Sequence, residues 1–403
     1  MSKLEELIAR LCPDGVEYKK LCDCVKSISN INWNKAEGQY RYIDLSSVDR
    51  DKHCILETQV VNADNAPSRA KQIILKDDVL VGTTRPLLKR YCIIPDDYDN
   101  NICSTGFCVL RAEKSIVLPR WIYHNVSSND FFAHVELFQK GASYPAISDK
   151  ELKEYKLPVP PLEVQREIVH ILDSFTLLTA ELAAELAARQ KQYEFYRDEL
   201  LNTDENRIEL KQVVKKASSG STPNKKNIEY YEGGMIPWIR TQDVKFNEIT
   251  AVDSFITEKA VQETSAKWIP ENCVIVAISG ATAGRCAINK IKATTNQHCL
   301  NMIVDESKAL YKYVFYCVAN QYEELVARKQ GARGDLNSSL ILSLKIPVPP
   351  LSEQQRIVDI LDRFDALCND ITSGLPAEIE ARKKQYEYYR DKLLTFKELK
   401  KEA

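Results

Sequence analysis

The sequence lacks any long uninterrupted hydrophobic run and is poor in glycine, proline and methionine. Its 403 residues include 13 glycines, 16 prolines and 3 methionines, while 44% are hydrophobic and 28% are charged. No apolar stretch approaches the roughly 18–20 residues that a membrane-spanning helix needs, and the composition excludes a mainly disordered or collagen-like chain. At roughly 100–200 residues per domain, the length indicates two or more folded domains. Because the polar segment Met1–Arg10 does not resemble a signal peptide, we expect a cytoplasmic protein without membrane contact.

The twelve cysteines include no Cys-x-x-Cys pair, which is the spacing typical of zinc sites. Cys22 and Cys24 are one residue apart, and His53-Cys54 offers only one further pair of ligands. We therefore predict no metal site. Five cysteines in apolar runs are expected to behave as small buried hydrophobic residues, namely Cys92, Cys273, Cys286, Cys299 and Cys317.

Motifs of common catalytic sites are also missing. There is no Walker phosphate loop, no His-Glu-x-x-His, no Gly-x-Gly-x-x-Gly and no Gly-x-Ser-x-Gly. The five histidines show neither metal nor triad spacing. An Asn/Asp-Pro-Pro-aromatic turn, with which a DNA methyltransferase would grip a flipped base, is absent as well. The chain is therefore predicted to have no catalytic residues and no cofactor of its own.

What the sequence does contain is an internal repeat. Residues Pro158–Phe175 and Pro347–Phe364 are identical at 12 of 18 positions, at an offset of 189 residues. A second pair of segments, Arg189–Leu201 and Arg382–Leu394, agrees at 10 of 13 positions at an offset of 193. The later copy thus holds four extra residues, about one turn of helix. Similarity on this scale indicates two copies of one structural plan.

Each copy of the repeat opens with a Pro-x-Pro-Pro stretch that cannot be helical, and a long helix is predicted to follow it. In the first copy, apolar residues recur at spacings of four and three over Leu162–Leu201, with one stutter. The second copy has a similar seam interrupted at Ser373-Gly374-Leu375-Pro376, where glycine and proline should kink or break the helix. The simplest partner of each seam is the other copy. Four tyrosines of the seams could equally hold a partner subunit, namely Tyr193, Tyr196, Tyr386 and Tyr389.

The segments between the helices are predicted to be short β-strands separated by polar loops, with helical patches such as Ala309–Arg328. The predicted strands are Ile73–Leu75, Val79–Gly82, Phe107–Leu110, Cys273–Ser279 and Leu300–Val304. The predicted fold class is therefore α/β (α+β). The predicted order is globule 1–157, long helix 158–207, globule 208–346 and long helix 347–403.

The nearly balanced totals of 55 basic and 57 acidic residues conceal a difference between modules. The two helical modules together carry six more acidic than basic residues, whereas the two globules together carry four more basic than acidic residues. This asymmetry favours the globules as the place for an anionic ligand.

Basic, amide and small hydroxyl residues collect in loops of both globules. Arginine reads guanine bidentately, asparagine and glutamine read adenine, and hydroxyl or glycine loops let the backbone approach phosphates. A solvated surface loop is the alternative for any single cluster, and recurrence in both globules favours nucleic acid. The candidate DNA-binding residues are Arg69, Thr83, Arg85, Lys89, Lys140, Ser143, Lys225, Arg240, Gln242, Ser279, Thr282, Arg285, Asn296, Gln297, Lys329 and Arg333.

Several of these segments resemble the DNA specificity subunit of type I restriction-modification enzymes, and the duplicated layout covers nearly the whole chain. The first globule matches more loosely, because it lacks the Gly-Ser-Thr-Pro opening of the second globule. The segments that carry the resemblance are Gly220-Ser221-Thr222-Pro223, Tyr230–Ile239, Phe255–Lys259, Ser279–Arg285, Pro347–Leu351 and the following Gln354-Gln355-Arg356-Ile357-Val358.

The resemblance implies two target-recognition domains, each reading one half of a split, asymmetric site in double-stranded DNA. It also implies two helices that pair antiparallel as a coiled-coil spacer, with a pseudo-two-fold relation that mirrors the duplex. Arg240, Gln242, Arg285 and Asn296 would be base or phosphate readers in the second half-site. Looser counterparts in the first half-site would be Arg69, Arg85, Lys89 and Ser143.

Catalysis in that family resides in partner subunits. Two modification subunits would bind S-adenosylmethionine and methylate adenine, and restriction subunits would use ATP and magnesium to translocate and cleave DNA. The resemblance implies that these subunits dock on the helices of this chain, and that the complex serves host defence in a bacterial or archaeal cell.

Two other functions stay open on the sequence. A tandem structural scaffold would use its globules to bind protein and its helices to set a spacing. A free-standing modification enzyme is the third reading, and the missing base-gripping motif argues against it.

Overall fold

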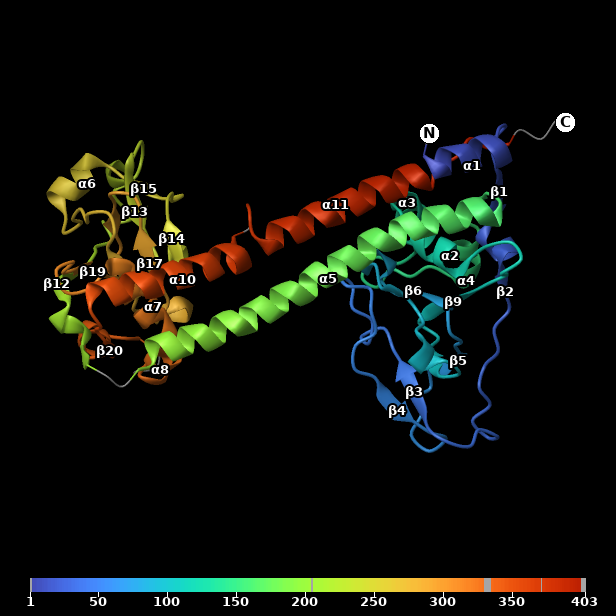
Figure 1. The fold of residues 1–403 in the computed structure, drawn as a ribbon, viewed down its shortest axis with the longest axis horizontal. Helices are drawn as coiled ribbons and strands as arrows, with labels where there is room; N and C mark the ends of the chain where they lie inside the picture. Colours follow the sequence, from blue (N-terminus) through green and yellow to red (C-terminus); the bar gives the residue numbers. More distant parts are fainter. Residues whose placement is uncertain (1, 204–205, 330–334, 371, 400–403) are drawn as a thin grey trace. The chain divides into compact units, whose positions relative to one another are not determined.

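The computed structural model describes residues 2–203, 206–329, 335–370 and 372–399, and the chain divides into two compact units (Figure 1). Unit 1 comprises Met1–Ala183 and Glu378–Ala403, and unit 2 comprises Ala184–Ala377. Both units mix short strands with helices, so the predicted mixed α/β class is confirmed. Within the described residues, no helix is long and apolar enough to cross a membrane.

Unit 1 contains three small sheets. Its strands are β1 (Glu17–Lys20), β2 (Val25–Lys26), β3 (Tyr40–Ile43), β4 (Gln59–Val61), β5 (Ala70–Ile73), β6 (Val79–Gly82), β7 (Tyr91–Ile93), β8 (Ile102–Ser104), β9 (Phe107–Ala112) and β10 (Lys156–Val159). One sheet has the antiparallel order β2-β9-β6-β7, and a second has the order β4-β3-β8-β5 with β3 and β8 parallel. Strand β1 pairs with β10, which includes Pro158 and Val159, the first two residues of the Pro-x-Pro-Pro stretch.

The helices of unit 1 cover the sheet formed by β2, β9, β6 and β7, and they share its hydrophobic core. They are α1 (Lys3–Leu11), α2 (Pro119–Val126), α3 (Asn129–Phe138), α4 (Asp149–Lys153), the first part of α5 (Leu162–Leu201) and most of α11 (Leu375–Leu393). Short 3₁₀ helices lie at η1 (Leu21–Cys24), η2 (Pro86–Leu88) and η3 (Asp96–Tyr98).

Unit 2 has a comparable arrangement. Its strands are β11 (Arg207–Glu209), β12 (Val214–Ser219), β13 (Ile236–Ile239), β14 (Asn247–Ile249), β15 (Phe255–Ile256), β16 (Val274–Ala277), β17 (Cys286–Asn289), β18 (Thr294–Thr295), β19 (Cys299–Val304) and β20 (Lys345–Pro347). The sheets have the orders β12-β19-β16-β17-β14, β15-β13-β18 and β11-β20. In both units the main sheet starts at an edge strand, β2 or β12, and continues with β9 or β19 and then with the antiparallel hairpin β6-β7 or β16-β17. Unit 2 adds β14 beside β17.

Helices again pack on the larger sheet of unit 2, and its main core joins them to the strands. They are α7 (Tyr311–Asn320), α8 (Tyr322–Ala327), α9 (Ser338–Leu342), α10 (Leu351–Asn369) and the remainder of α5. Helix α6 (Glu258–Glu263) packs instead on β13 and β15 in a smaller core. Short 3₁₀ helices lie at η4 (Leu210–Gln212), η5 (Ile228–Tyr230), η6 (Thr241–Asp243) and η7 (Gly280–Thr282).

Most strands predicted from the sequence are present. Val79–Gly82 is β6, and the predictions at Phe107–Leu110, Cys273–Ser279 and Leu300–Val304 overlap β9, β16 and β19. The prediction at Ile73–Leu75 was wrong, because β5 ends at Ile73. A turn follows instead, in which the amide of Leu75 donates to the Asp78 carboxylate at 2.8 Å and the amide of Asp78 donates to the Leu75 carbonyl at 3.0 Å.

The long helix over Leu162–Leu201 is confirmed as α5, which runs unbroken for 40 residues. The second copy is interrupted as predicted, since α10 ends at Asn369 and α11 begins at Leu375. The Asp370 carboxylate accepts hydrogen bonds from the Ser373 hydroxyl at 2.5 Å and from the hydroxyl and amide of Thr372 at 2.6 and 2.7 Å. The Ser373 bond, together with the Thr372 bonds, lowers the pKa of Asp370 to about 2.

A buried glutamine joins the globule of unit 1 to the start of α5. The Gln165 side chain is fully buried; its Oε1 accepts from the Leu118 amide at 2.9 Å, and its Nε2 donates to the carbonyls of Pro160 and Ile116 at 2.8 and 3.0 Å. Leu118 is the N-cap of α2, so the glutamine satisfies an amide that the helix itself cannot pair. Trp121 adds a bond from its indole N–H to the Pro158 carbonyl at 3.0 Å.

The same bonds recur in unit 2. Gln354 is also fully buried, and its Oε1 accepts from the amide of Leu310, the N-cap of α7, at 2.9 Å. Its Nε2 donates to Pro349 and Lys308 carbonyls at 2.8 and 3.2 Å, and the Tyr313 hydroxyl donates to the Pro347 carbonyl at 3.1 Å. We call each of these arrangements a glutamine joint. Both lie in the Pro-x-Pro-Pro segments that the sequence repeats.

Replacing Gln165 with alanine should destabilise unit 1 strongly. The Gln165→Ala change leaves a buried amide and two buried carbonyls without partners, and we expect it to lower the free energy of unfolding by roughly 2–4 kcal/mol. Urea unfolding would give the loss, and hydrogen exchange would locate it in unit 1. The exposed Gln190 of the same helix is the matched control, and Gln190→Ala should change stability by less than about 0.5 kcal/mol. Equal effects of the two changes would contradict the role of the joint.

Candidate nucleic-acid interface

The β6-β7 hairpin of unit 1 carries three candidate residues. Thr83 is buried, and both its amide and its hydroxyl donate to the Gly106 carbonyl, at 2.8 and 2.9 Å. Its hydroxyl is therefore committed to holding the loop. Arg85 and Lys89 are exposed, and they flank η2 with left-handed backbone angles of φ 47° and 53°.

A second loop, residues 139–146, lies against this hairpin. Thr84 and Ala146 form a β-bridge, the Arg85 amide donates to the Pro145 carbonyl at 2.7 Å, and the Arg85 guanidinium lies 4.2 Å from the centre of the Tyr144 ring. The structure thus brings Thr83, Arg85 and the loop that contains Lys140 and Ser143 together. The Lys140 ammonium donates to Glu151 at 2.5 Å, and that bond lowers the pKa of the Glu151 carboxyl to about 2.

Arg69 and Lys89 are placed at the edges of this group. The Thr105 amide donates to the Arg69 carbonyl at 3.0 Å, within the same turn that receives the Thr83 bonds. The Lys89 ammonium lies 5.0 Å from the centre of the Phe132 ring, where it packs on α3. Unit 1 therefore gathers its candidate residues around one hairpin.

In unit 2, the Gly-Ser-Thr-Pro segment lies against the turn after β18. The Ser221 amide donates to the Thr295 carbonyl at 2.9 Å, and the Thr222 hydroxyl bonds to the Gln297 side chain. A Cβ at Gly220 would lie 2.0 Å from the Thr295 carbonyl oxygen, so this close approach requires glycine. The bond between Thr222 and Gln297 was missed in the sequence, because 75 residues separate the two partners.

Asn296 and Arg240 meet at the same place. The Asn296 amide donates to the Ile239 carbonyl at 2.9 Å, next to Arg240. The Asn296 side chain is buried, and its oxygen accepts from the His298 amide at 3.1 Å. Asn296 thus shapes a turn, and the side chains left toward solvent are those of Gln297 and the neighbouring Gln242.

Arg240 and Lys225 line an open cleft of about 470 Å³. Its other walls are Ile228, Tyr231, Trp238, Asp253, Ser254 and Phe255. The Arg240 amide donates to Asp243 at 2.8 Å, whereas its buried Nε has no hydrogen-bond partner among the described residues. The cleft thus combines two cations with aromatic walls, which suits the stacking and charge of nucleic acid.

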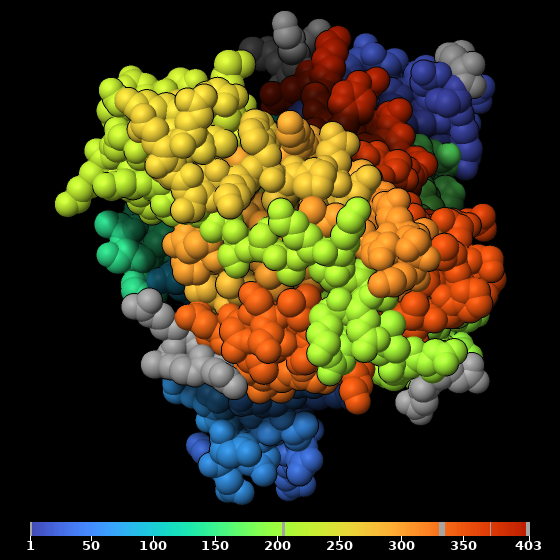
Figure 2. All heavy atoms as spheres, turned by 90° about the vertical axis from the view of Figure 1, so that its left-hand side faces the viewer, coloured from blue at the N-terminus to red at the C-terminus, as the bar shows by residue number. Residues whose placement is uncertain are grey.

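The β16-β17 hairpin of unit 2 holds Ser279, Thr282 and Arg285. The Arg285 amide donates to the Thr282 carbonyl at 3.0 Å, and the turn uses left-handed glycines at Gly280 and Gly284. The Ile278 amide donates to the His298 carbonyl at 2.9 Å, which ties this hairpin to the turn that contains Asn296 and Gln297. Figure 2 faces unit 2 and shows the segments around β12 and α6, lime green and yellow, at its surface.

Lys329 is not brought into this group by any described contact, since it follows the C-terminal end of α8 and its amide donates to Val326. Arg333 lies outside the described residues. A groove of about 990 Å³ elsewhere in unit 2 differs in charge, because Glu248, Asp362, Asp365 and Asp370 outnumber its two lysines, Lys245 and Lys312. That groove is unsuited to a polyanion.

The four tyrosines considered for subunit docking make contacts inside their own units. Tyr389 stacks on Phe175 with ring centres 5.5 Å apart, and Tyr193 and Tyr196 lie 6.1 and 5.8 Å from the Phe364 ring. The Tyr386 hydroxyl bonds to His124 at 2.9 Å. These contacts fit the first of the two roles considered for the tyrosines, packing of the two helical segments against each other within the chain. Docking of a partner subunit on them stays a prediction.

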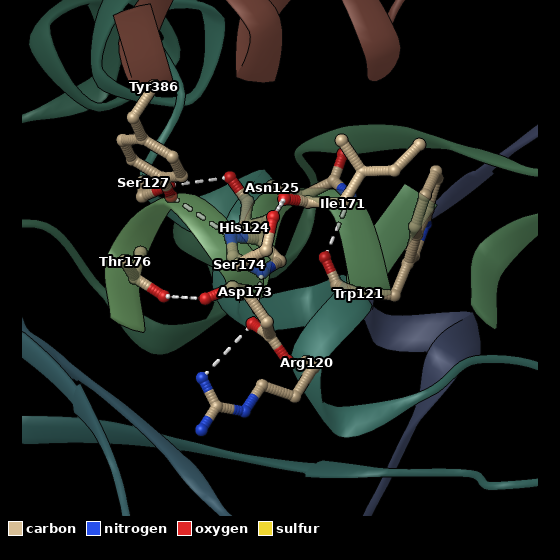
Figure 3. A network of polar contacts seen from close by, with 10 residues as sticks. All are labelled: Arg120, Trp121, His124, Asn125, Ser127, Ile171, Asp173, Ser174, Thr176 and Tyr386. Carbon is tan, nitrogen blue, oxygen red and sulfur yellow. Dashed lines mark hydrogen bonds and ion pairs between the residues drawn. The ribbon is translucent and has the colours of Figure 1, made fainter. Parts of the chain in front are cut away.

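Figure 3 shows the polar network around Tyr386 in unit 1. His124 is fully buried on α2, with Nδ1 2.9 Å from the Tyr386 hydroxyl and Nε2 2.9 Å from Asp173 of α5. Arg120 also pairs with Asp173, at 3.2 Å. Burial lowers the pKa of His124, so the ring is neutral, with Nε2–H donating to Asp173 and Nδ1 accepting from Tyr386.

Unit 2 places a tyrosine in the comparable network. The Tyr316 hydroxyl donates to Asp362 at 2.6 Å, and Lys312 pairs with the same carboxylate at 2.8 Å. Asp173 and Asp362 occupy identical positions in the repeated segment. The sequence analysis did not single out this pair; the identity of the two positions could have marked it, but the partners on α2 and α7 could not be inferred from the repeat.

Unit 1 should lose stability in mild acid because of His124. A folded-state pKa below the unfolded value of about 6.5 means that the unfolded chain binds more protons below pH 6.5. The free energy of unfolding of unit 1 therefore keeps its full value with respect to His124 above pH 6.5. It declines by up to about 1.4 kcal/mol per pH unit as the pH falls toward the folded-state pKa. Urea unfolding between pH 7.5 and 5 would measure it.

His124→Gln should reduce this slope without abolishing it, since burial also lowers the pKa of His53 in unit 1 to about 4. An unchanged slope in His124→Gln would show that the network does not sense pH.

The described residues contain no group of three or more His, Cys, Asp or Glu side chains that could hold a metal ion. The five cysteines predicted to be buried are buried, and burial raises the pKa of Cys92 and Cys317 to about 12. Thiols in this state are poor nucleophiles and poor metal ligands.

The chain matches the family model described as type I restriction modification DNA specificity domain twice, over residues 13–189 and 203–381. The protein belongs to this family and carries two copies of its domain. The chain is similar to the specificity subunit of the type I restriction enzyme EcoR124I/EcoR124II of Escherichia coli, with 42% identity over 263 residues. The match covers 62% of this chain and 65% of that protein.

A putative type I restriction enzyme specificity subunit of Haemophilus influenzae is 34% identical over 297 residues, which cover 69% of this chain and 72% of the relative. Among solved structures, a chain from a study of complex assembly and conformational transition in the type I R-M system has a TM-score of 0.67 at 24% identity, covering 95% of this chain and 98% of its own. The HsdS subunit of Thermoanaerobacter tengcongensis has a TM-score of 0.52 at 23% identity, with coverage of 95% and 97%. These two likenesses show a shared fold.

Proposed function

We propose that this chain is the sequence-specific DNA-binding subunit of a type I restriction-modification enzyme, in which each globule reads one half of a bipartite site. The observation that carries the proposal is that both copies of the family domain place arginine side chains in the loop of a β-hairpin, β6-β7 or β16-β17, with polar loops packed against it. Arg85 and Lys89 flank the hairpin turn of unit 1, and Arg285 ends the hairpin turn of unit 2. Such loops suit both phosphate contacts and base readout.

The two half-sites differ in sequence. In unit 1 the hairpin turn is built by non-glycine residues in left-handed conformation, whereas in unit 2 glycines occupy the turn. The aromatic cleft of Lys225 and Arg240 belongs to unit 2, and the Arg85–Tyr144 stack belongs to unit 1. Different side chains in comparable places favour different bases, so the recognised site is asymmetric.

The two long helical segments act as an antiparallel coiled-coil spacer between pseudo-two-fold related domains. Ring contacts within each unit support this arrangement. Phe175, early in α5, contacts Tyr389 late in the second repeat, and Tyr196, late in α5, contacts Phe364 early in that repeat. The proposed boundaries are globules at 1–157 and 208–346 with helices at 158–207 and 347–403. Half-sites read from one face of the duplex lie about one helical turn, or roughly 34–36 Å, apart.

Methylation and cleavage belong to partner subunits. Two modification subunits would supply S-adenosylmethionine-dependent adenine methylation, and restriction subunits would supply ATP- and magnesium-dependent translocation and cleavage. The acidic groove beside α10 is suited to protein rather than to DNA, and therefore offers a surface on which such a partner docks. The chain itself is a non-catalytic subunit of a complex that acts inside a bacterial or archaeal cell.

Methylation mapping of host DNA tests the function directly. Comparison of a host strain with a strain that lacks this gene should reveal methylated adenines in one bipartite, asymmetric motif that disappears with the gene. A scaffold without sequence preference would leave no such motif, and that result would reject the proposal.

Arg285→Ala should weaken binding of the assembled complex to its cognate DNA by on the order of tenfold to hundredfold, because the hairpin loses its cation. Titration with cognate DNA and with DNA that has either half scrambled would measure the effect. The control is Arg356→Ala, since Arg356 lies on α10 and pairs with Glu353 at 2.7 Å. If Arg285→Ala binds all duplexes as tightly as the wild type, its assigned role is wrong.

A further inference from the structure

An exposed arginine–tyrosine stack stands at the β6-β7 hairpin of unit 1. The Arg85 guanidinium carbon lies 4.2 Å from the centre of the Tyr144 ring, and 70% of the Tyr144 surface is exposed. A tyrosine with this exposure contributes little to the hydrophobic core. Stacking on it does, however, restrict the plane of the guanidinium.

The guanidinium of Arg85 has no carboxylate partner among the described residues. Lys140 in the adjoining loop donates to Glu151 at 2.5 Å, and Arg111 on the same sheet pairs with the buried Asp78 at 2.7 Å. Lys89 of the same hairpin also has no ion pair among the described residues, but of these two exposed cations only Arg85 carries a planar donor group. Its N–H fork remains available to a ligand.

The backbone around Arg85 is fixed in an uncommon conformation. Arg85 and Lys89 are non-glycine residues with left-handed φ angles, which are strained and persist only where the surroundings hold them. The bonds that hold this loop run from the Arg85 amide to the Pro145 carbonyl at 2.7 Å and from the Lys89 amide to the Pro86 carbonyl at 2.9 Å. The loops around Arg85 and Pro145, 60 residues apart in sequence, are therefore bonded to each other and together fix the position of the Arg85 side chain.

We propose that Arg85 reads a guanine in the half-site bound by unit 1, through paired hydrogen bonds to O6 and N7 in the major groove, and that Tyr144 is its positioning residue. This inference rests on the proposed function and specifies one contact of it. A bidentate bond to a base edge needs an oriented plane, whereas a phosphate contact requires mainly charge. Of the two exposed lysines beside Arg85, Lys140 pairs with Glu151, and the Lys89 ammonium lies 5.0 Å from the centre of the Phe132 ring.

The test uses the full chain assembled with its modification subunits and the site found by methylation mapping. Binding is measured on the cognate duplex and on duplexes in which each G·C pair of either half-site is replaced in turn. Arg85→Ala should bind the cognate duplex on the order of tenfold to hundredfold more weakly. It should bind one substituted duplex as well as the wild type does, because the contact at that pair is already lost.

Variants of Arg85 and Tyr144 distinguish the effect of the oriented guanidinium plane from that of its positive charge. Arg85→Lys keeps the charge and should lose discrimination at the same base pair. Tyr144→Phe keeps the ring and should behave as wild type, whereas Tyr144→Leu should lose part of that discrimination. Lys114→Ala is the matched control, because Lys114 is an exposed cation of unit 1 that pairs with Asp77 at 3.0 Å and is not a candidate DNA-binding residue; it should leave discrimination at this base pair unchanged.

Three results would overturn the assignment. A uniform loss over all duplexes with a shallower salt dependence would make Arg85 a phosphate contact. Unchanged binding would leave it without a role, and a mapped site without any G·C pair in either half would exclude the contact. If instead the wild-type complex bound all duplexes equally, the proposed function itself would fail. Arg85→Lys keeps the test decisive if Arg85→Ala does not fold.

Discussion

A buried glutamine at the start of each long helical segment holds the globule of each unit in place. Its amide group cannot be left unpaired in the core, since a buried polar group without a partner costs about 1–3 kcal/mol. Gln165 meets this requirement by bonding the N-cap amide of α2, a carbonyl just before α2 and a carbonyl just before α5. Gln354 does the same for α7 and α10. The position of each sheet relative to its helix follows from this joint. The hairpins that carry Arg85 and Arg285 are positioned by those sheets.

The candidate DNA-binding residues fall into two physical groups. Thr83 and Asn296 spend their polar atoms on the turns they occupy, so they shape the loops. Gln297 likewise bonds to Thr222 and His298 through its side chain, whereas Arg85 and Arg285 present side chains from loops that other bonds hold. This division explains why the charge of the globules alone was a weak signal for DNA binding: the loops need internal hydrogen bonds before any side chain can be oriented toward DNA. The internal bonds also favour recognition of DNA by loops that are already formed in the free protein.

The repeat was the most informative feature of the sequence. It correctly predicted α5 over Leu162–Leu201 and the break between α10 and α11, because periodicity and proline act locally. The turn after Ile73 was missed, since a short apolar run carries no mark of the Asp78 side chain that ends the strand. Contacts such as that of Tyr386 with His124, 262 residues apart, depend on the tertiary fold. The stack of Arg85 on Tyr144 joins two separate loops in the same way.

If two different globules on one chain read two separated half-sites, hydroxyl-radical footprinting of the assembled complex on a duplex with its mapped site will reveal both. We expect two protected segments on one face of the duplex, with centres about one helical turn apart, and loss of a single segment when one half-site is scrambled. One continuous protected segment that survives scrambling of either half would contradict it.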